Sequence, residues 1–269
     1  MNNVPQIVTI KEIIEETPTI KTFKFDWDFE KYGKPNPGEF VMVWNFNNEK
    51  PMSISQINDN ELAITVKNIG EFTSQIHSLN VGDQIGIRGS YGNGFTNDFT
   101  GKKVLAIGGG VGMAPINAIA TDLIKKGNQV DVIPAAQTKD ELLYMTSLEE
   151  LGANVFPCTD DGSFGFEGFA TDRTISLLEE RSYDIAFICG PEIMMKGIFK
   201  ILEDAEINAE FSMERYMKCA LGICGQCCVD KTGWRICVEG PVFTSEQLAQ
   251  IDEFGVYRRK ASGLKEFYK

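Results

Sequence analysis

Four cysteines in one short window constrain this chain more than any other feature. Four residues separate Cys219 from Cys224, two separate Cys224 from Cys227, and nine separate Cys227 from Cys237. The first two gaps match the plant-type ligand run of a 2Fe-2S cluster. The glycines of the loop allow a tight backbone that can point its amides at the sulfurs. We therefore predict that these four thiolates hold a 2Fe-2S cluster and that the chain transfers single electrons.

Two other uses of the cysteines are less well supported. Structural zinc prefers two matched Cys-x-x-Cys pairs, whereas three of these cysteines crowd one loop and the fourth follows a predicted hairpin. A disulfide framework is disfavoured because seven cysteines, an odd number, fit a reducing compartment better. Of the remaining three, Cys158 and Cys189 end apolar runs and are expected to be buried. Cys228 follows a ligand directly and is a stray thiol or a fold residue.

Charge and hydropathy exclude several classes of function. The formal net charge of −12 disfavours nucleic acid as a partner, since binding phosphates requires a positive field. No apolar stretch is long enough to span a bilayer, and the N-terminus lacks the regions of a signal peptide. We therefore expect a cytoplasmic protein with no membrane partner. His77 is the only histidine, which excludes mechanisms built on several histidines but not hydride or electron transfer.

The pattern of apolar segments divides the chain into three predicted domains. Residues 1–100 contain six β-branched or alternating segments between turn residues, which predicts a small antiparallel β-barrel. Residues 101–209 alternate strands with helices, which predicts a Rossmann-like α/β domain with a parallel sheet. Residues 210–269 hold the cysteine module and a tail, where Thr244 to Gln247 form a capping box that predicts a helix through Ile251. The expected strands are 8–11, 20–25, 39–44, 52–57, 62–68, 84–89, 104–107, 129–133, 154–158 and 185–189, and the expected helices of the second domain are 114–126 and 192–204.

Two loops of the second domain are candidate nucleotide sites. The first follows an apolar strand and opens a helix, a position in which glycines let the backbone approach a pyrophosphate. Its candidate residues are Gly108, Gly109, Gly110, Gly112 and Pro115. The second loop, Cys189-Gly190-Pro191, ends a later strand at the carboxyl edge of the same sheet, where ligands bind in open α/β folds. A tight turn alone also needs glycine, and a packing role would be the usual expectation for Cys189 by itself.

Taken together, the ordered motifs resemble the ferredoxin-NADP reductase superfamily. Within it, the chain is most similar to the family of electron transfer subunits of type B dihydroorotate dehydrogenases. The resemblance runs through nearly the whole chain. Besides the loops and cysteines above, it rests on Lys50-Pro51-Met52-Ser53, Gly89 to Phe95, Thr159-Asp160-Asp161-Gly162-Ser163, Ser212 to Cys219 and Gly240-Pro241-Val242-Phe243.

The resemblance implies a set of cofactors and a partner. It implies that the barrel binds FAD, that the α/β domain binds NAD as electron acceptor, and that the cluster connects FAD to FMN in a dihydroorotate dehydrogenase catalytic subunit. It further implies a heterotetramer with two copies of each subunit and a role in pyrimidine (UMP) biosynthesis. The implied FAD contacts are Lys50, Pro51, Met52, Ser53, Thr65, Val66, Lys67, Phe72 and Thr73. The resemblance also implies that Gly190 and Pro191 bind NAD together with the first glycine loop. Cys189 is the implied catalytic residue. Lys50 replaces the family's arginine, and Phe72 replaces a glycine before Thr73.

A chain of this length leaves no room for the (β/α)₈ barrel of roughly 250 residues that would carry FMN and dihydroorotate, so a partner is required. An alternative of the same class is the small flavin and iron-sulfur subunit of an NAD(P)H-dependent ferredoxin transhydrogenase, sulfide dehydrogenase or hydrogenase. An alternative of another class is a non-catalytic iron-sulfur sensor or scaffold. Stoichiometric FAD and NADH-dependent dye reduction by the purified chain would reject the scaffold.

Overall fold

Six antiparallel strands close into a barrel in the N-terminal part of the chain, in the order β1-β2-β5-β4-β3-β6. The structure is a computed structural model that describes residues 3–268; residues 1, 2 and 269, at the ends of the first and third predicted domains, lie outside the described residues. All six predicted barrel strands are present, so the predicted barrel is confirmed. They are β1 (Gln6–Thr17), β2 (Ile20–Asp26), β3 (Phe40–Trp44), β4 (Glu49–Asn58), β5 (Glu61–Lys67) and β6 (Gln84–Tyr91).

Alternation along the strands fills the barrel with apolar side chains. Phe23 and Phe25 of β2 point inward, together with Ile64 of β5 and Ile87 of β6, because successive strand residues face opposite sides of a sheet. The short helix α1 (Phe29–Tyr32) follows β2. Helix α2 (Glu71–His77) packs Phe72 and Ile76 against this core. Burial of such side chains contributes about 1.5–3 kcal/mol each, which makes the barrel a rigid support for one face of the site.

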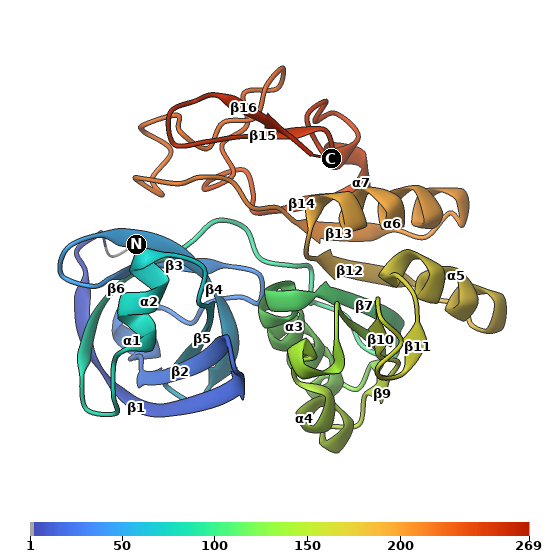
Figure 1. Cartoon of the computed structure of the whole chain (residues 1–269), viewed down its shortest axis with the longest axis horizontal. Coiled ribbons are helices and arrows are strands. Elements are labelled where there is room, and N and C mark those ends of the chain that lie inside the picture. The colour runs from blue at the N-terminus through green and yellow to red at the C-terminus, as the bar shows by residue number, and fades with distance from the viewer. Residues whose placement is uncertain (1–2, 269) are drawn as a thin grey trace.

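The α/β domain is a three-layer arrangement, and Figure 1 shows it beside the barrel. Its sheet has the order β11-β10-β8-β7-β12-β13-β14, with β9 beside β8. Val104 and Ala106 of β7 pack with helices α3 and α4, whereas Leu105 and Ile107 pack with α5 and α6. This alternation follows from the two-residue repeat of a strand buried on both faces. The strands are β7 (Lys103–Gly109), β8 (Gln129–Ala136), β9 (Asn154–Val155), β10 (Cys158–Thr159), β11 (Phe166–Glu167), β12 (Ile185–Cys189), β13 (Ala209–Ser212) and β14 (Val242–Thr244), and the helices are α3 (Met113–Lys125), α4 (Met145–Glu150), α5 (Ala170–Glu180) and α6 (Glu192–Asp204).

The expected strand 154–158 is interrupted. It forms the two short strands β9 and β10, which both pair with β8 and are separated by Phe156 and Pro157. Pro157 has no amide hydrogen to donate to a neighbouring strand, which accounts for the break. The short 3₁₀ helices η1 (Gly110–Gly112) and η2 (Lys139–Glu141) lie in the loops of this domain.

The C-terminal part shares the core of the α/β domain. Strand β13 spans the predicted boundary after residue 209, and β14 returns from beyond the cysteines to pair antiparallel with β13. Cys227, Ile236 and Phe254 belong to the same apolar cluster as α5 and α6. The division into domains at residue 209 therefore remains an interpretation. The tail consists of α7 (Ser245–Leu248) and the hairpin of β15 (Tyr257–Arg259) and β16 (Lys265–Phe267).

Helix α7 begins as its sequence predicts. The Thr244 hydroxyl accepts a hydrogen bond from the amide of Gln247, and the Gln247 side chain accepts one from the amide of Thr244. The helix ends at Leu248, short of the predicted Ile251. Across residues 3–268, none of the helices combines the length and the apolar character that crossing a membrane requires.

Candidate functional site

A cavity of about 230 Å³ lies where the barrel, the α/β domain and the segment before the cysteines meet. Barrel residues form one wall, and the start of α3 forms the wall opposite. The third side is closed by Ser212, Met213, Glu214, Arg215, Met217 and Pro241. The predicted cofactor residues that line the cavity are Pro51, Met52, Ser53, Thr65, Val66, Lys67, Thr73, Gly112 and Pro115.

The lining suits a flat aromatic ring with polar edges. Met52, Val66 and Met213 supply apolar surface, and the hydroxyls of Ser53 and Thr73 supply hydrogen-bonding groups. Ligand sites commonly combine mostly apolar walls with a few placed polar groups, often between domains. The residues present therefore fit a flavin ring, whose edge carries donors and acceptors. Phe40 and Ile69 also line the cavity, and no motif singled them out in the sequence.

Two of the predicted FAD residues lie outside the cavity lining. The side chain of Phe72 is 9% exposed and packs in the barrel core instead. The Lys50 ammonium lies over the ring of Tyr216, 4.9 Å from its centroid, so it is beside the cavity wall and not in it. Thr73 lines the cavity, and its hydroxyl also accepts a hydrogen bond from the amide of Gly70 at 3.0 Å.

The two predicted nucleotide loops pack directly against each other. A Cβ atom at Gly112 would lie 2.6 Å from the carbonyl oxygen of Cys189, and one at Gly109 would lie 2.8 Å from Cδ of Pro191. Only glycine fits at such distances, so these glycines allow the loops to meet at the carboxyl ends of β7 and β12. The predicted residues Gly108 and Gly109 at the end of β7, and Gly110, Gly190 and Pro191 in the two loops, do not line the cavity. Dinucleotides bind at this edge of open α/β sheets, so the loops fit an NAD site.

Cys189 lies behind the cavity and not in its wall. It is 3% exposed, as expected for a cysteine that ends an apolar run. Burial and the nearby charge of Glu214 raise the pKa of this thiol, which therefore stays protonated at neutral pH. Glu214 and Ser212 line the cavity next to Cys189. Both residues lie in the segment Ser212 to Cys219 that carries the resemblance, but the sequence motif alone indicates no role for Ser212 or Glu214.

The four ligand cysteines form two pairs. Cys219 and Cys224 interact through their side chains, and a hydrogen bond joins the thiols of Cys227 and Cys237. The charge of Cys219 also acts on Cys237, so the two pairs lie close to each other. A fold-back of the chain creates the second pair, because the amide of Ile236 donates to the carbonyl of Cys227 at 3.2 Å. The hairpin predicted before Cys237 is thus present.

This pairing fits two irons better than one zinc ion. A zinc site gathers four ligands around one point, whereas the irons of a 2Fe-2S cluster share four thiolates between two metals. The donor set of four thiols in two pairs therefore favours the two-iron cluster.

Backbone amides prepare the loop for thiolates. Burial raises the pKa of the Cys219 thiol, but the amides of Cys224 and Leu221, each 3.4 Å from its sulfur, outweigh burial and lower that pKa to about 7. The hydrogen bond from Cys237 lowers the pKa of Cys227 to about 6 and raises that of Cys237. Thiolates are the form that binds iron. The loop needs its glycines for this shape, since a Cβ at Gly222, where φ is +72°, would lie 2.7 Å from Val238.

The barrel holds the first cluster ligand in place. The guanidinium of Arg88, on β6, donates a hydrogen bond of 3.0 Å to the carbonyl oxygen of Cys219. Arg88 also pairs with both carboxylate oxygens of Glu49, at 2.9 and 2.6 Å, and bonds the hydroxyl of Tyr91. An arginine fixed by such a bidentate pair has little freedom to move. The cysteine loop is thereby oriented toward the barrel.

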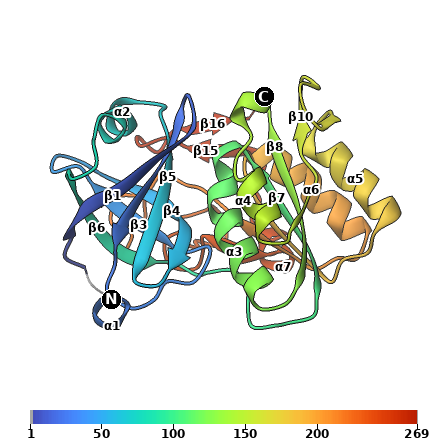
Figure 2. The ribbon, with the colours of Figure 1, turned by 90° about the horizontal axis from the view of Figure 1, so that it is seen from below.

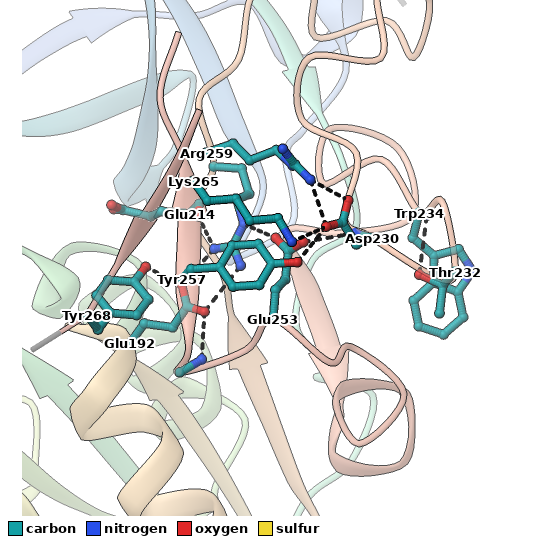
Figure 3. Close-up of polar contacts among 12 residues, drawn as sticks. Glu192, Glu214, Asp230, Thr232, Trp234, Glu253, Tyr257, Arg259, Lys265 and Tyr268 are labelled. Carbon is teal, nitrogen blue, oxygen red and sulfur yellow. Dashed lines mark hydrogen bonds and ion pairs between the residues drawn. The ribbon is translucent and has the colours of Figure 1, made fainter. Parts of the chain in front are cut away.

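A buried ionic network holds the cysteine module against the nucleotide loops. The Arg215 guanidinium contacts Glu192 at 2.6 Å and Glu253 at 2.8 Å, and these three side chains are 3%, 6% and 0% exposed. The Tyr268 hydroxyl donates to Glu192 at 2.7 Å, and the amide of Asp230 donates to Glu253 at 2.9 Å. Figure 3 shows Glu192, Glu253 and Tyr268 converging from helix α6 and the tail. Glu192 follows the second nucleotide loop directly, so this network links the nucleotide and cysteine parts.

Comparison with protein families supports two of the three parts. A model described as the iron-sulfur cluster binding domain of dihydroorotate dehydrogenase B matches residues 214–249. A model described as an oxidoreductase NAD-binding domain matches residues 106–200. The first match includes all four ligand cysteines, and the second includes both nucleotide loops.

Similar proteins cover nearly the full chain. The chain is 50% identical over 263 residues, 97% of each chain, to a probable dihydroorotate dehydrogenase B (NAD(+)) electron transfer subunit of Methanothermobacter thermautotrophicus. It is 47% identical to the protein of that description from Methanocaldococcus jannaschii, over 98% of this chain and 99% of the other. A solved NADH-dependent reduced ferredoxin-NADP oxidoreductase, described in work on flavin-based electron bifurcation, has a TM-score of 0.80 and 26% identity over 93% of this chain and 94% of that one. A ferredoxin NADP+ reductase of Neisseria gonorrhoeae with bound FAD and NADP shares the fold, with a TM-score of 0.64 and 19% identity over 74% of this chain and 91% of that one.

Proposed function

The chain belongs to the family of dihydroorotate dehydrogenase B electron transfer subunits, and we propose that it passes electrons from a catalytic partner subunit through a 2Fe-2S cluster and FAD to NAD. It is an oxidoreductase subunit, and the pathway it serves is pyrimidine (UMP) synthesis. We further propose that the partner contains FMN, that two copies of each subunit assemble, and that the complex works in a reducing, cytoplasmic compartment. Seven free cysteines among residues 3–268 support the last point.

One observation carries the proposal. The cavity wall that runs from Ser212 to Met217 ends two residues before the first cluster ligand, Cys219, and the wall opposite belongs to the nucleotide loop. The residues proposed for the flavin, and residues next to the proposed nucleotide and cluster sites, therefore line the same cavity. Such proximity favours transfer between them without diffusion of any carrier.

When bound, the cluster would carry one electron at a time, and the flavin would collect two and pass a hydride to NAD. The chain contributes position and environment. We propose that Ser53 donates a hydrogen bond to the flavin or its phosphates and that Lys50 attracts the phosphates from beside the cavity. Thr73, whose hydroxyl donates to the Gly70 carbonyl at 2.9 Å, is proposed to lie against the flavin without donating to it. Hydrogen bonds to charged groups contribute about 1.5–3 kcal/mol.

At the nucleotide loops, we propose that the backbone makes most of the contacts to the bound nucleotide. Gly112, Ala114 and Pro115 place the N-terminus of α3 at the cavity, and a helix N-terminus stabilises an anionic pyrophosphate. We propose that Cys189 acts as a neutral thiol close to where the nicotinamide would lie. Its raised pKa supports this, because a buried thiolate would repel electrons that arrive as a hydride.

The partner is proposed to dock on the exposed edge of the cysteine loop. Ile223, between two ligands, is 81% exposed, and Val238, directly after Cys237, is 38% exposed. Cys224 is exposed as well. Figure 1 shows this module across the top of the molecule, away from the base of the barrel and of the α/β domain. Covering these apolar groups would exclude water from the cluster and shorten the path to the partner.

A pair of variants tests the docking face. Ile223→Glu places a charge in the proposed interface and should weaken assembly with the catalytic subunit by on the order of tenfold to hundredfold, with NADH-to-dye turnover unchanged. The matched control is Ile175→Glu on α5, where the isoleucine is 46% exposed. The two subunits are mixed, and their affinity and NAD-linked dihydroorotate oxidation are measured. Equal assembly of both variants would place the interface elsewhere, and NAD-linked oxidation of dihydroorotate by this chain alone would refute the division of labour.

A further inference from the structure

A chain of hydroxyl groups joins the α/β domain to the barrel strand that lines the flavin cavity. The Tyr144 hydroxyl, from the loop before α4, lies 2.5 Å from Oγ1 of Thr65 on β5. Thr65 Oγ1 lies 2.8 Å from Oγ1 of Thr22, and Thr22 donates to the Glu16 carboxylate at 2.7 Å. Tyr144, Thr65 and Thr22 are 7%, 3% and 0% exposed, so water does not compete for these bonds.

Hydrogen-bonding capacity sets the direction at both ends of this chain of hydroxyls. A carboxylate only accepts, so the proton of Thr22 points to Glu16, and the single proton of Thr65 is available to Thr22 or to Oγ of Ser55, 2.9 Å away. Thr65 in turn accepts from Tyr144, whose burial raises its pKa to about 12 and keeps the hydroxyl protonated. The Tyr144 hydroxyl therefore donates its hydrogen bond to Thr65 of the barrel, and neighbouring hydrogen bonds in such a chain polarise one another.

The Tyr144–Thr65 contact lies at the interface between the two domains. The 230 Å³ cavity opens on one side of it, and a second hollow of about 880 Å³, lined by α3 and by barrel loops, opens on another. Figure 2 shows α3 between the barrel strands and the sheet, and α3 packs on β4 there. The other buried polar link at this position joins Asn117 of α3 to the carbonyl of Ser55 at 2.9 Å. Two buried polar links therefore accompany the packing of α3 on β4.

Tyr144 adopts an unfavourable backbone conformation while its hydroxyl contacts Thr65. Its φ of 60° and ψ of 13° are left-handed, a conformation that bulky residues rarely adopt. The surrounding structure maintains such a conformation only where several contacts determine it. Here the ring is buried, the hydroxyl is bonded to the barrel, and the carbonyl accepts from the amide of Leu148 at 3.0 Å.

We propose that Tyr144 is a positioning residue that sets the orientation of the nucleotide domain on the flavin barrel, and with it the distance for hydride transfer. The proposal rests on the proposed function, since it concerns transfer between NADH and FAD. Thr65 lines the flavin cavity, and Gly112 and Pro115 line the wall opposite. A rotation about the Tyr144 contact would change the separation of these walls. Displacements of about 1 Å can cost about a hundredfold in rate.

Tyr144→Phe removes the hydroxyl and keeps the ring. We expect NADH to reduce the bound FAD about tenfold to hundredfold more slowly, with kcat lowered and KM for NADH unchanged, because the nucleotide loops are untouched. The measurement is stopped-flow flavin reduction in the FAD-loaded full chain. Tyr183→Phe is the matched control, since its hydroxyl bonds Asp131 at 2.8 Å within the α/β domain. The control should lose stability but keep the wild-type rate.

A second variant, on the barrel side of the contact, keeps the proposal testable if Tyr144→Phe does not fold. Thr22→Val removes the link to Glu16 and should slow hydride transfer less than Tyr144→Phe does, and the double variant should be less than additive. Wild-type rates in both single variants, or an equal loss in Tyr183→Phe, would overturn the proposal. Failure of the wild-type chain to bind FAD or to be reduced by NADH would instead refute the proposed function.

Discussion

Replacing Arg215 by methionine tests the network that holds the cysteine module to the nucleotide loops. The change removes the cation from two ion pairs and leaves the Glu192 and Glu253 carboxylates buried, at 6% and 0% exposure. Breaking a buried pair in this way costs about 3–5 kcal/mol. Each kcal/mol lowers the melting temperature by about 2–4 °C in chains of 150–250 residues, so we expect a decrease of about 6–20 °C.

The assay is thermal unfolding followed by circular dichroism at neutral pH. Arg259→Met is the matched control, because this arginine pairs with Asp230 at the surface, where the side chains are 31% and 38% exposed. Surface pairs contribute about 0–1 kcal/mol, so the control should melt within about 4 °C of wild type. If Arg215→Met melted no lower than the control, the buried carboxylates would not depend on Arg215 and the anchoring role would be refuted.

Three further predictions concern the cluster, the flavin and pH. Cys224→Ser should lose most iron and sulfide yet keep part of the NADH-to-dye activity, whereas Cys228→Ser should retain the cluster; the opposite pattern in an iron and sulfide assay would show that the ligands are misassigned. Lys50→Ala should weaken FAD by roughly tenfold to a hundredfold in a fluorescence titration, and an unchanged affinity would place the phosphates elsewhere. Burial raises the pKa of Glu16 from 4.5, so wild-type stability should fall as pH rises from 4.5 through the folded-state pKa. Glu16→Gln should therefore be more stable than wild type at pH 7 but not at about pH 4, and urea unfolding that shows no such crossover would contradict this.

Local patterns were sufficient to predict much of the fold. The six barrel strands follow from two-residue alternation between turn residues, and the capping box of Thr244 and Gln247 starts α7 as expected. The glycine loop before α3 and the cysteine run were also visible, because each depends on neighbouring residues. The resemblance to known families added cofactors that these patterns alone left open.

The rest depends on contacts between residues far apart in the sequence. Arg88 reaches Cys219 across 131 positions, and Thr65 meets Tyr144 across 79. The spacing of apolar residues along the sequence cannot predict contacts between residues so far apart. The inward turn of Phe72 was missed for a related reason: a residue at the start of a short helix can face the core or a ligand, and only packing decides. The shared core of the C-terminal part likewise appears only when β14 joins β13.

The most direct test of the electron route is rapid-freeze electron paramagnetic resonance of the assembled complex. Dihydroorotate is mixed with the two subunits under anaerobic conditions, with and without NAD. We predict that the signal of a reduced 2Fe-2S cluster appears before NADH forms, and that a complex containing Cys224→Ser shows neither the signal nor NAD-linked turnover. Wild-type production of NADH by the complex that lacks the cluster would contradict the proposed route through the cysteine loop.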